Sequence, residues 1–116
     1  MLISDGIKIY LHLPPTDMRK SIDTLCVLVS ETLKMNPAEG HLFLFRNRTG
    51  NKLKALYYEM NCFTLIYRRL EKGKFVFPKN AFGSIEMTHA HFKWLLASDK
   101  YSRMDAMEPN HYANYC

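Results

Sequence analysis

The segment HLFLFRNRTGNKLKALYYEMNCFTLIYRRLEKGKFVFPK, residues 41–79, decides the fold, because strand-forming runs alternate in it with short turn sequences. Residues 41–46 are apolar at both parities, which predicts a central strand that is covered on both faces. The connection over residues 47–51 is rich in turn-forming side chains and is too short for a crossover. We therefore expect residues 52–58 to form a second strand, antiparallel to the first.

The remainder of the segment is less uniform. Residues 63–70 fit a strand by their aromatic and β-branched content, while their continuation into RRLEK is also compatible with a short helix. Residues 74–77 are expected to form a short strand that Pro78 closes.

The chain before this segment predicts a strand followed by a helix. Residues 7–13 alternate apolar and polar side chains, as a strand with one buried face does. Two prolines end this strand, and Thr16 or Asp17 then supplies a helix N-cap. A helix from about Met18 to Met35 is expected to follow, because its apolar residues recur at helical spacing.

The chain after the segment predicts one short strand and one helix. Residues 84–87 fit a last short strand, and Thr88 is expected to cap a second helix with Phe92, Leu95 and Leu96 on its inner face. Together these elements predict an α+β fold. We expect a small single domain over residues 1–98, with a largely antiparallel sheet of hairpins, one long N-terminal helix and a short C-terminal helix. Residues 99–116 are polar and aperiodic, which predicts a flexible tail.

Composition narrows the class of protein. The chain has 116 residues and 47% hydrophobic side chains, which is enough for one buried core. Its three cysteines have no paired spacing, as is typical of a protein from the reducing cytoplasm. The N-terminus has no secretory leader pattern, and no run of about 20 apolar residues could span a membrane. We expect a cytoplasmic protein that contacts no membrane.

The sequence gives no sign of a catalytic or metal site. Its acidic residues are scattered, whereas a metal-dependent nuclease or transposase needs several converging carboxylates. His89 and His91 are two apart on a predicted helix and would point in different directions, so we expect a solvated helix face. Phosphate-binding glycine motifs are absent from the sequence, and neither Cys26 nor Cys62 has an activating partner nearby in sequence. We therefore expect no enzyme activity, no cofactor and no bound metal.

Positive charge gathers in the hairpin region. From Arg46 to Lys79 nine basic residues face two glutamates, a balance of +7, while the whole chain carries +5. Such a surface could lie against phosphates, with Tyr57, Tyr58 and Tyr67 adding stacking contacts. It could equally be a solubilising sheet face whose lysines protect an edge strand. The candidate nucleic-acid-binding residues are Arg19, Lys20, Arg46, Arg48, Lys52, Lys54, Arg68, Arg69, Lys72 and Lys74.

A second dense patch is TDMRKS at residues 16–21. One interpretation is a helix cap in which Asp17 favours the helix dipole. Another is that Arg19 and Lys20 extend the basic surface of the hairpins. A third is that Asp17 pairs with an arginine of the neighbouring sheet.

Three blocks together resemble a known family. TDMRKSID at 16–23, GHLFLFRNRTGNKLKALYYE at 40–59 and YRRLEKGKFVFP at 67–78 are similar to the Orf2-like (TnpB) accessory protein of the insertion sequence 66 family of bacterial transposable elements. The paired leucines Leu95-Leu96 also fit, and the resemblance covers roughly residues 5–97. The chain departs from the family where Met60, Asn61 and Cys62 replace the usual tryptophans and glycine.

The resemblance implies an accessory role in transposition, a form of DNA recombination, beside a separate transposase that holds the catalytic carboxylates. It gives no catalytic residues to carry over to this chain. Two functions follow as expectations. The chain is a non-enzymatic DNA-binding or complex-assembly factor that meets the ends of the element, or it is an adaptor that docks on the transposase of the same element without touching DNA.

Overall fold

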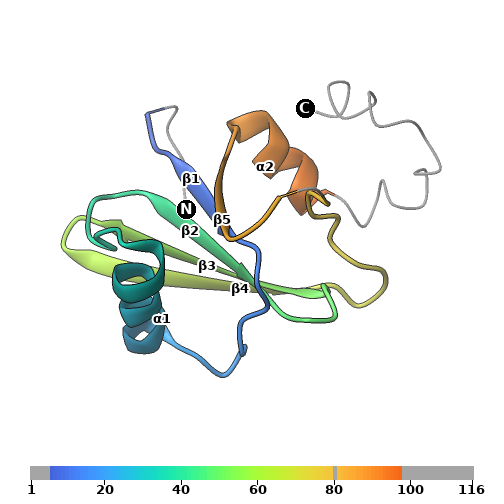
Figure 1. Cartoon of the computed structure of the whole chain (residues 1–116), viewed down its shortest axis with the longest axis horizontal. Helices are drawn as coiled ribbons and strands as arrows, with labels where there is room; N and C mark the ends of the chain where they lie inside the picture. The colour runs from blue at the N-terminus through green and yellow to red at the C-terminus, as the bar shows by residue number, and fades with distance from the viewer. Residues whose placement is uncertain (1–5, 80, 98–116) are drawn as a thin grey trace.

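A computed structural model describes residues 6–79 and 81–97 of the chain. They form a five-stranded sheet with one helical segment on each face (Figure 1). The strands are β1 (Ile9–His12), β2 (Leu42–Arg46), β3 (Lys52–Glu59), β4 (Cys62–Arg69) and β5 (Ser84–Met87). Their order across the sheet is β4-β3-β2-β1-β5, so β2 is central. The expected α+β class is confirmed.

The pairing of the strands confirms the predicted hairpins. β2 pairs antiparallel with β3, and β3 pairs antiparallel with β4, so residues 63–69 belong to a strand and not to a helix. β5 pairs antiparallel with β1 at the other edge. The exception is β1 with β2, which run parallel because a helical crossover joins them. The sheet is therefore mostly antiparallel.

Each face of the sheet has its own apolar core, as expected for a central strand apolar at both parities. On one face Phe43, Phe45 and Leu56 pack against Leu25 and Val29 of the first helix. On the other face the side chains of alternate residues, such as Leu42 and Leu44, pack against the second helix. Figure 1 shows the two helices on opposite sides of the strands.

The first helix differs from its prediction. It comprises the α-helix α1 (Ile22–Leu28) followed directly by a π-helical stretch, η1 (Val29–Leu33), and Lys34 in the left-handed region (φ 59°) ends it. It begins after Ser21, whose amide donates to Thr24 Oγ1 at 2.9 Å, so neither Thr16 nor Asp17 is its N-cap. The expected single long helix from Met18 is therefore wrong at its start.

Contacts with the sheet explain the later start of α1. The Thr16 amide donates to the carbonyl of Arg46 at 2.7 Å, which draws the chain along the end of β2. The carbonyls of Met18 and Lys20 accept hydrogen bonds from the Lys54 side chain. Because these main-chain groups bond to the sheet, residues 15–20 form an irregular segment with one turn at its end and not the start of α1. We call residues 15–20 the strap.

The second helix agrees with its prediction. α2 (His89–Leu96) is capped by Thr88, whose Oγ1 accepts from the His91 amide at 3.0 Å. Its buried residues include Phe92 and Leu95. It covers the sheet face opposite α1.

The strand expected at residues 74–77 is not formed. The Phe75 amide donates instead to the carbonyl of Gly50 at 2.8 Å, and the Phe75 ring is buried in the core. Gly50 has φ +84°, a conformation that favours glycine, and it lies against Phe75 and Phe77. Phe75 and Phe77 therefore pack the loop after β4 against the β2–β3 loop. The same apolar residues would fit a strand, so the sequence alone does not distinguish the two.

Two expectations fall on residues outside the described part of the chain. They are the flexible tail over residues 99–116 and the first residues of the predicted domain. Among residues 6–79 and 81–97, no helix combines the length and the apolar character needed to cross a membrane.

Candidate nucleic-acid interface

Strand register divides the basic side chains of the sheet between its two faces. Lys52 pairs with Arg69, and Lys54 lies two residues further along the same strand, so these three side chains point to the α1 face. Arg46 and Arg68 occupy the opposite parity in the same register and point to the α2 face. The ten predicted residues therefore do not form one continuous surface.

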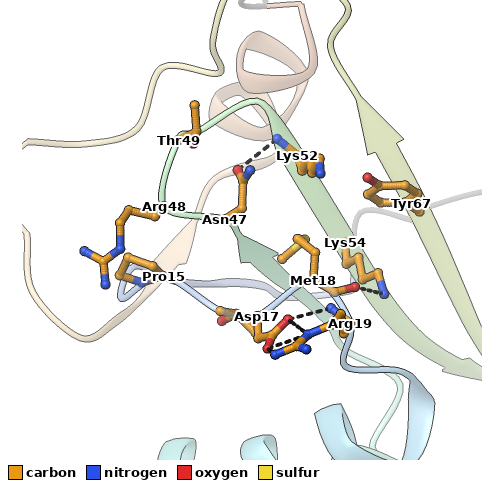
Figure 2. A pocket seen from close by; sticks show the side chains of 11 residues that line it. Pro15, Asp17, Met18, Arg19, Asn47, Arg48, Thr49, Lys52, Lys54 and Tyr67 are labelled. Atoms are coloured by element: carbon orange, nitrogen blue, oxygen red, sulfur yellow. Dashed lines mark hydrogen bonds and ion pairs between the residues drawn. The ribbon is translucent and has the colours of Figure 1, made fainter.

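Part of the positive charge gathers around an open hollow of about 740 Å³ on the α1 face (Figure 2). The strap forms one wall, the β2–β3 loop forms another, and β3 and β4 form the floor. Four basic side chains and one carboxylate line it, a balance of +3. We call it the basic hollow, and its lining residues are Pro15, Thr16, Asp17, Met18, Arg19, Asn47, Arg48, Thr49, Lys52, Lys54 and Tyr67.

Lys54 builds the hollow as well as lining it. Its ammonium donates to the carbonyl oxygens of Met18 at 2.7 Å and Lys20 at 2.6 Å, and it lies 5.6 Å from the centre of the Tyr67 ring. An ammonium has three donors, so two are committed to holding the strap against the sheet. Lys20 contributes main-chain hydrogen bonds here, because its carbonyl accepts from Lys54 and its amide donates to the Asp17 carbonyl, and its side chain does not line the hollow.

Arg19 and Asp17 form an ion pair on the rim of the hollow. Arg19 Nη2 lies 2.7 Å from Asp17 Oδ2, and its Nε lies 3.0 Å from the same oxygen. These hydrogen bonds lower the pKa of Asp17 to about 2. Asp17 therefore pairs within the strap and not with an arginine of the sheet, and the pair partly neutralises Arg19.

The remaining two cations of the hollow are less engaged. Within residues 6–79 and 81–97, no ion pair involves the side chain of Arg48 or Lys52. Arg48 is exposed at the tip of the β2–β3 loop, and Lys52 begins β3. Asn47 fixes the loop between them, because its Oδ1 accepts from the amides of Gly50 and Lys52, each at 3.0 Å. Two charges available to a ligand thus stand on a well-ordered support.

The predicted residues on the α2 face have other surroundings. Arg46 Nε donates to the Leu13 carbonyl at 2.5 Å, and its guanidinium lies 5.3 Å from the centre of the Phe77 ring. Its described contacts therefore link β2 to the residue after β1 and to the loop after β4. Arg68 is exposed beside an apolar groove of about 210 Å³, whose other lining residues are Leu44, Leu53, Ala55, Ile66, Phe92 and Leu96.

Three further predicted residues lie at the end of β4 and in the loop after it, and they do not line the hollow. Arg69 pairs with Glu71 at 2.9 Å, and both side chains are exposed. Lys72 and Lys74 are exposed in the loop that follows β4. Exposed charges of this kind serve solubility equally well, so the geometry gives them no specific site.

The three candidate tyrosines separate clearly. Tyr57 is buried, and burial together with the neighbouring Glu59 raises its pKa. Tyr58 packs against Phe63, with 4.8 Å between ring centres. Tyr67 alone of the three lines the hollow, and it is 48% exposed. The sequence singled out all three equally, because only the register shows which ring lies beside the lysines.

The hollow also contains polar groups that sequence reasoning did not select, namely Thr16, Asn47 and Thr49. Thr16 Oγ1 is buried, and among the described residues it has no hydrogen-bond partner. The NRTGN turn was the available signal for Asn47, but nothing local in sequence brings Thr16 to this loop. Their meeting depends on the strap.

Other candidate chemistry gains no support. In the described part of the chain, no three His, Cys, Asp or Glu side chains gather as metal ligands would. His89 Nε2 donates to the carbonyl of Ile7, just before β1, at 2.7 Å. The expectation that His89 lies on a solvated helix face is therefore wrong for this residue. Burial raises the pKa of the Cys26 thiol, which opposes thiolate formation.

Comparison with known proteins identifies relatives over most of the chain. Two curated proteins of Sinorhizobium fredii (strain NBRC 101917 / NGR234) are similar to it. Uncharacterized protein y4hO is 35% identical over 79% of this chain and 80% of its own length, and Uncharacterized protein y4jC is 31% identical over 87% and 86%. No solved structure matches the chain. The family described as IS66 Orf2 like protein matches residues 7–106. The chain belongs to the family of IS66 Orf2-like proteins.

Proposed function

We propose that the chain is a non-enzymatic accessory protein of transposition that binds the DNA of its insertion sequence through the basic hollow. Membership of the IS66 Orf2-like family suggests the accessory role, beside a separate catalytic transposase. The observation that supports DNA as the ligand is the balance of +3 around one concave site. In this proposal the protein acts in the cytoplasm, where the DNA of a bacterial element lies.

The arrangement of the charges suits phosphate. Arg48 and Lys52 are free of ion pairs among the described residues, so they can neutralise phosphates without breaking an existing contact. Asn47 orders the loop that carries them, which reduces the entropy lost on binding. Arg19 can join them with one guanidinium edge while Asp17 holds the other.

The test is DNA binding across a salt series, with fluorescently labelled duplex and single-stranded DNA from the ends of the element. The variant Arg48→Gln with Lys52→Gln removes two cations of the hollow. We expect weaker binding and a salt slope flatter by about two units, since each phosphate contact contributes about 0.9. The matched control is Lys72→Gln with Lys74→Gln, which removes the same charge outside the hollow. An equal loss in both variants, or the absence of salt-dependent binding, would overturn the proposal.

A second candidate function is an adaptor that docks on the transposase without DNA. The observation that favours it is the apolar groove beside α2, with Phe92 and Leu96 in its wall and Arg68 at its side. Co-purification with the element's transposase after nuclease treatment tests it. If Arg68→Glu abolishes this association while the hollow variant retains it, the adaptor function is supported. No association in the absence of DNA removes it.

A further inference from the structure

We propose that the basic hollow binds DNA as a single strand, with one base stacked on Tyr67 and the backbone passing Lys52 towards Arg48. This inference rests on the proposed function, because the hollow itself is taken as the DNA site. It adds the form of DNA that the site accepts and an aromatic residue that recognises it.

The shape and lining of the site favour an unpaired strand. Its cations surround a concave space of about 740 Å³, which lies in the size range of small-ligand sites. A basic groove that also contains an exposed aromatic ring is the usual arrangement for single-stranded nucleic acid, since every base has a face that can stack. A paired base in a duplex keeps its faces inside the helical stack and could not reach a ring in the hollow.

The first helical segment is poorly suited to duplex DNA. A helix that reads the major groove presents basic and polar side chains to the bases and phosphates. The segment from Ile22 to Leu33 contains no basic residue, and its exposed side chains include Asp23 and Glu31. These carboxylates would repel phosphates. The positive charge therefore lies in the hollow and not on this helix.

Tyr67 is placed to receive a base. It lies on the edge strand β4, on the α1 face, where its register partner is Lys54. The Lys54 ammonium lies 5.6 Å from the ring centre and is itself fixed by the carbonyls of the strap. The contact with the ammonium restrains the ring, and the ring remains 48% exposed. Figure 2 shows Tyr67 beside Lys54 and Lys52, with Arg48 across the hollow.

The far side of the hollow suits the sugar–phosphate backbone. Arg48 and Thr49 follow Asn47 in the ordered loop, and Arg19 lies on the opposite rim. These groups are donors of the kind that contact phosphate and sugar oxygens without reading sequence. We therefore expect affinity for single strands of many sequences, with the salt dependence that phosphate contacts give.

The experiment compares a single strand of about 12 nucleotides, a common site size for such proteins, with the duplex of the same sequence at one fixed salt concentration. One central base is 2-aminopurine, whose fluorescence reports stacking. We expect the single strand to bind at least about tenfold more tightly than the duplex. Tyr67→Leu should weaken single-strand binding about tenfold and remove the fluorescence change, while Tyr67→Phe should retain both.

Controls separate this inference from the proposed function. Duplex binding as tight as single-strand binding, still sensitive to Arg48→Gln with Lys52→Gln, would overturn the single-strand inference and keep the proposed function. No binding of either DNA would overturn both. An abasic strand tests stacking with the unaltered protein, so a folding defect in Tyr67→Leu cannot hide the answer. If the abasic strand binds as tightly as the intact one, the stacking contact is refuted.

Discussion

Lys54 Nζ lies 2.6 Å from the main-chain carbonyl oxygen of Lys20 and so fastens the strap to β3. Its second bond, to the Met18 carbonyl, spans the same gap at 2.7 Å. Lys54 thus lies in the floor of the basic hollow and also holds the strap, which forms one of its walls. Lys54 therefore stabilises the fold, whereas Lys52, two residues earlier in β3, makes no ion pair among the described residues. Unfolding experiments can measure this difference.

Lys54→Met should lower the free energy of unfolding by about 2 kcal/mol, because the strap loses two charge-assisted hydrogen bonds. The matched variant Lys52→Met should change it by less than about 0.5 kcal/mol, since its side chain has no ion pair among the described residues. Urea unfolding of both variants measures the difference. Equal losses would mean that the strap is not held by Lys54.

Arg46→Met should also destabilise the fold, by about 2 kcal/mol. The substitution removes the hydrogen bond to the Leu13 carbonyl and the contact with the Phe77 ring, while it leaves a partly buried carbonyl unpaired. Arg48→Met, two residues away and exposed, is the control and should change stability by less than about 0.5 kcal/mol. A stable Arg46→Met variant with reduced DNA affinity would contradict the structural role given to Arg46.

The turn between β3 and β4 offers a stabilising change. Met60 and Asn61 both have positive φ, at 52° and 62°, which is costly for methionine. Met60→Asn combined with Asn61→Gly should raise the free energy of unfolding by about 1 kcal/mol, because Asn-Gly is preferred in such turns. Met60→Gln, which replaces the exposed apolar side chain but keeps the strain, should give much less gain. Thermal unfolding decides between backbone strain and simple exposure of Met60 as the cause.

Stability should fall as the pH drops below about 6.5, with His12 as one cause. Burial, and secondarily the charge of Arg46, lower the pKa of His12 below its ordinary value of 6.5. The unfolded chain therefore takes up this proton before the folded protein does. The His12 contribution is complete above pH 6.5 and is lost progressively as the pH falls towards the folded-state pKa.

Urea unfolding at a series of pH values measures this contribution. His12→Gln should reduce the slope of stability with pH below 6.5, whereas His41→Gln, at a ring that packs against Tyr10, should retain the His12 contribution. An unchanged slope in His12→Gln would refute the assignment.

Local pattern predicted the centre of the fold well. Residues 41–46 are apolar at both parities, and β2 is the central strand with both faces covered. The short connection over residues 47–51 also predicted the β2–β3 hairpin correctly, whereas residues 63–70 were left open between a strand and a short helix. These features depend on side-chain periodicity and loop length, which are visible in one stretch of sequence.

The errors have tertiary causes. The TDM sequence at residues 16–18 has the cap chemistry of a helix start, but hydrogen bonds to Arg46 and Lys54 hold this stretch on the sheet and delay α1 to Ile22. Residues 74–77 have a strand composition, yet the Phe75 amide bonds to Gly50. No local pattern reveals a partner from a distant loop.

The site was predicted only in part for the same reason. The basic residues were recognised, but the hollow arises where the strap meets the β2–β3 loop. The buried Thr16 hydroxyl, which has no hydrogen-bond partner within residues 6–79 and 81–97, lies in the strap. Strand parity placed Lys52 and Lys54 together. The register between the strands was needed to show that Tyr67 lies on the same face as these lysines. It was also needed to show that Arg46 and Arg68 lie on the opposite face.

The pairing of β1 with β5 has a consequence for synthesis on the ribosome. Ile9 pairs with Met87, so this edge of the sheet closes only after almost the whole described chain has emerged. The hairpins of β2, β3 and β4 can form earlier, while β1 keeps one unpaired edge that is open to other chains. A nascent chain interrupted before Ser84 would retain the basic hollow's residues but expose that edge. Synthesis must therefore continue through β5 before the open edge of β1 can be paired.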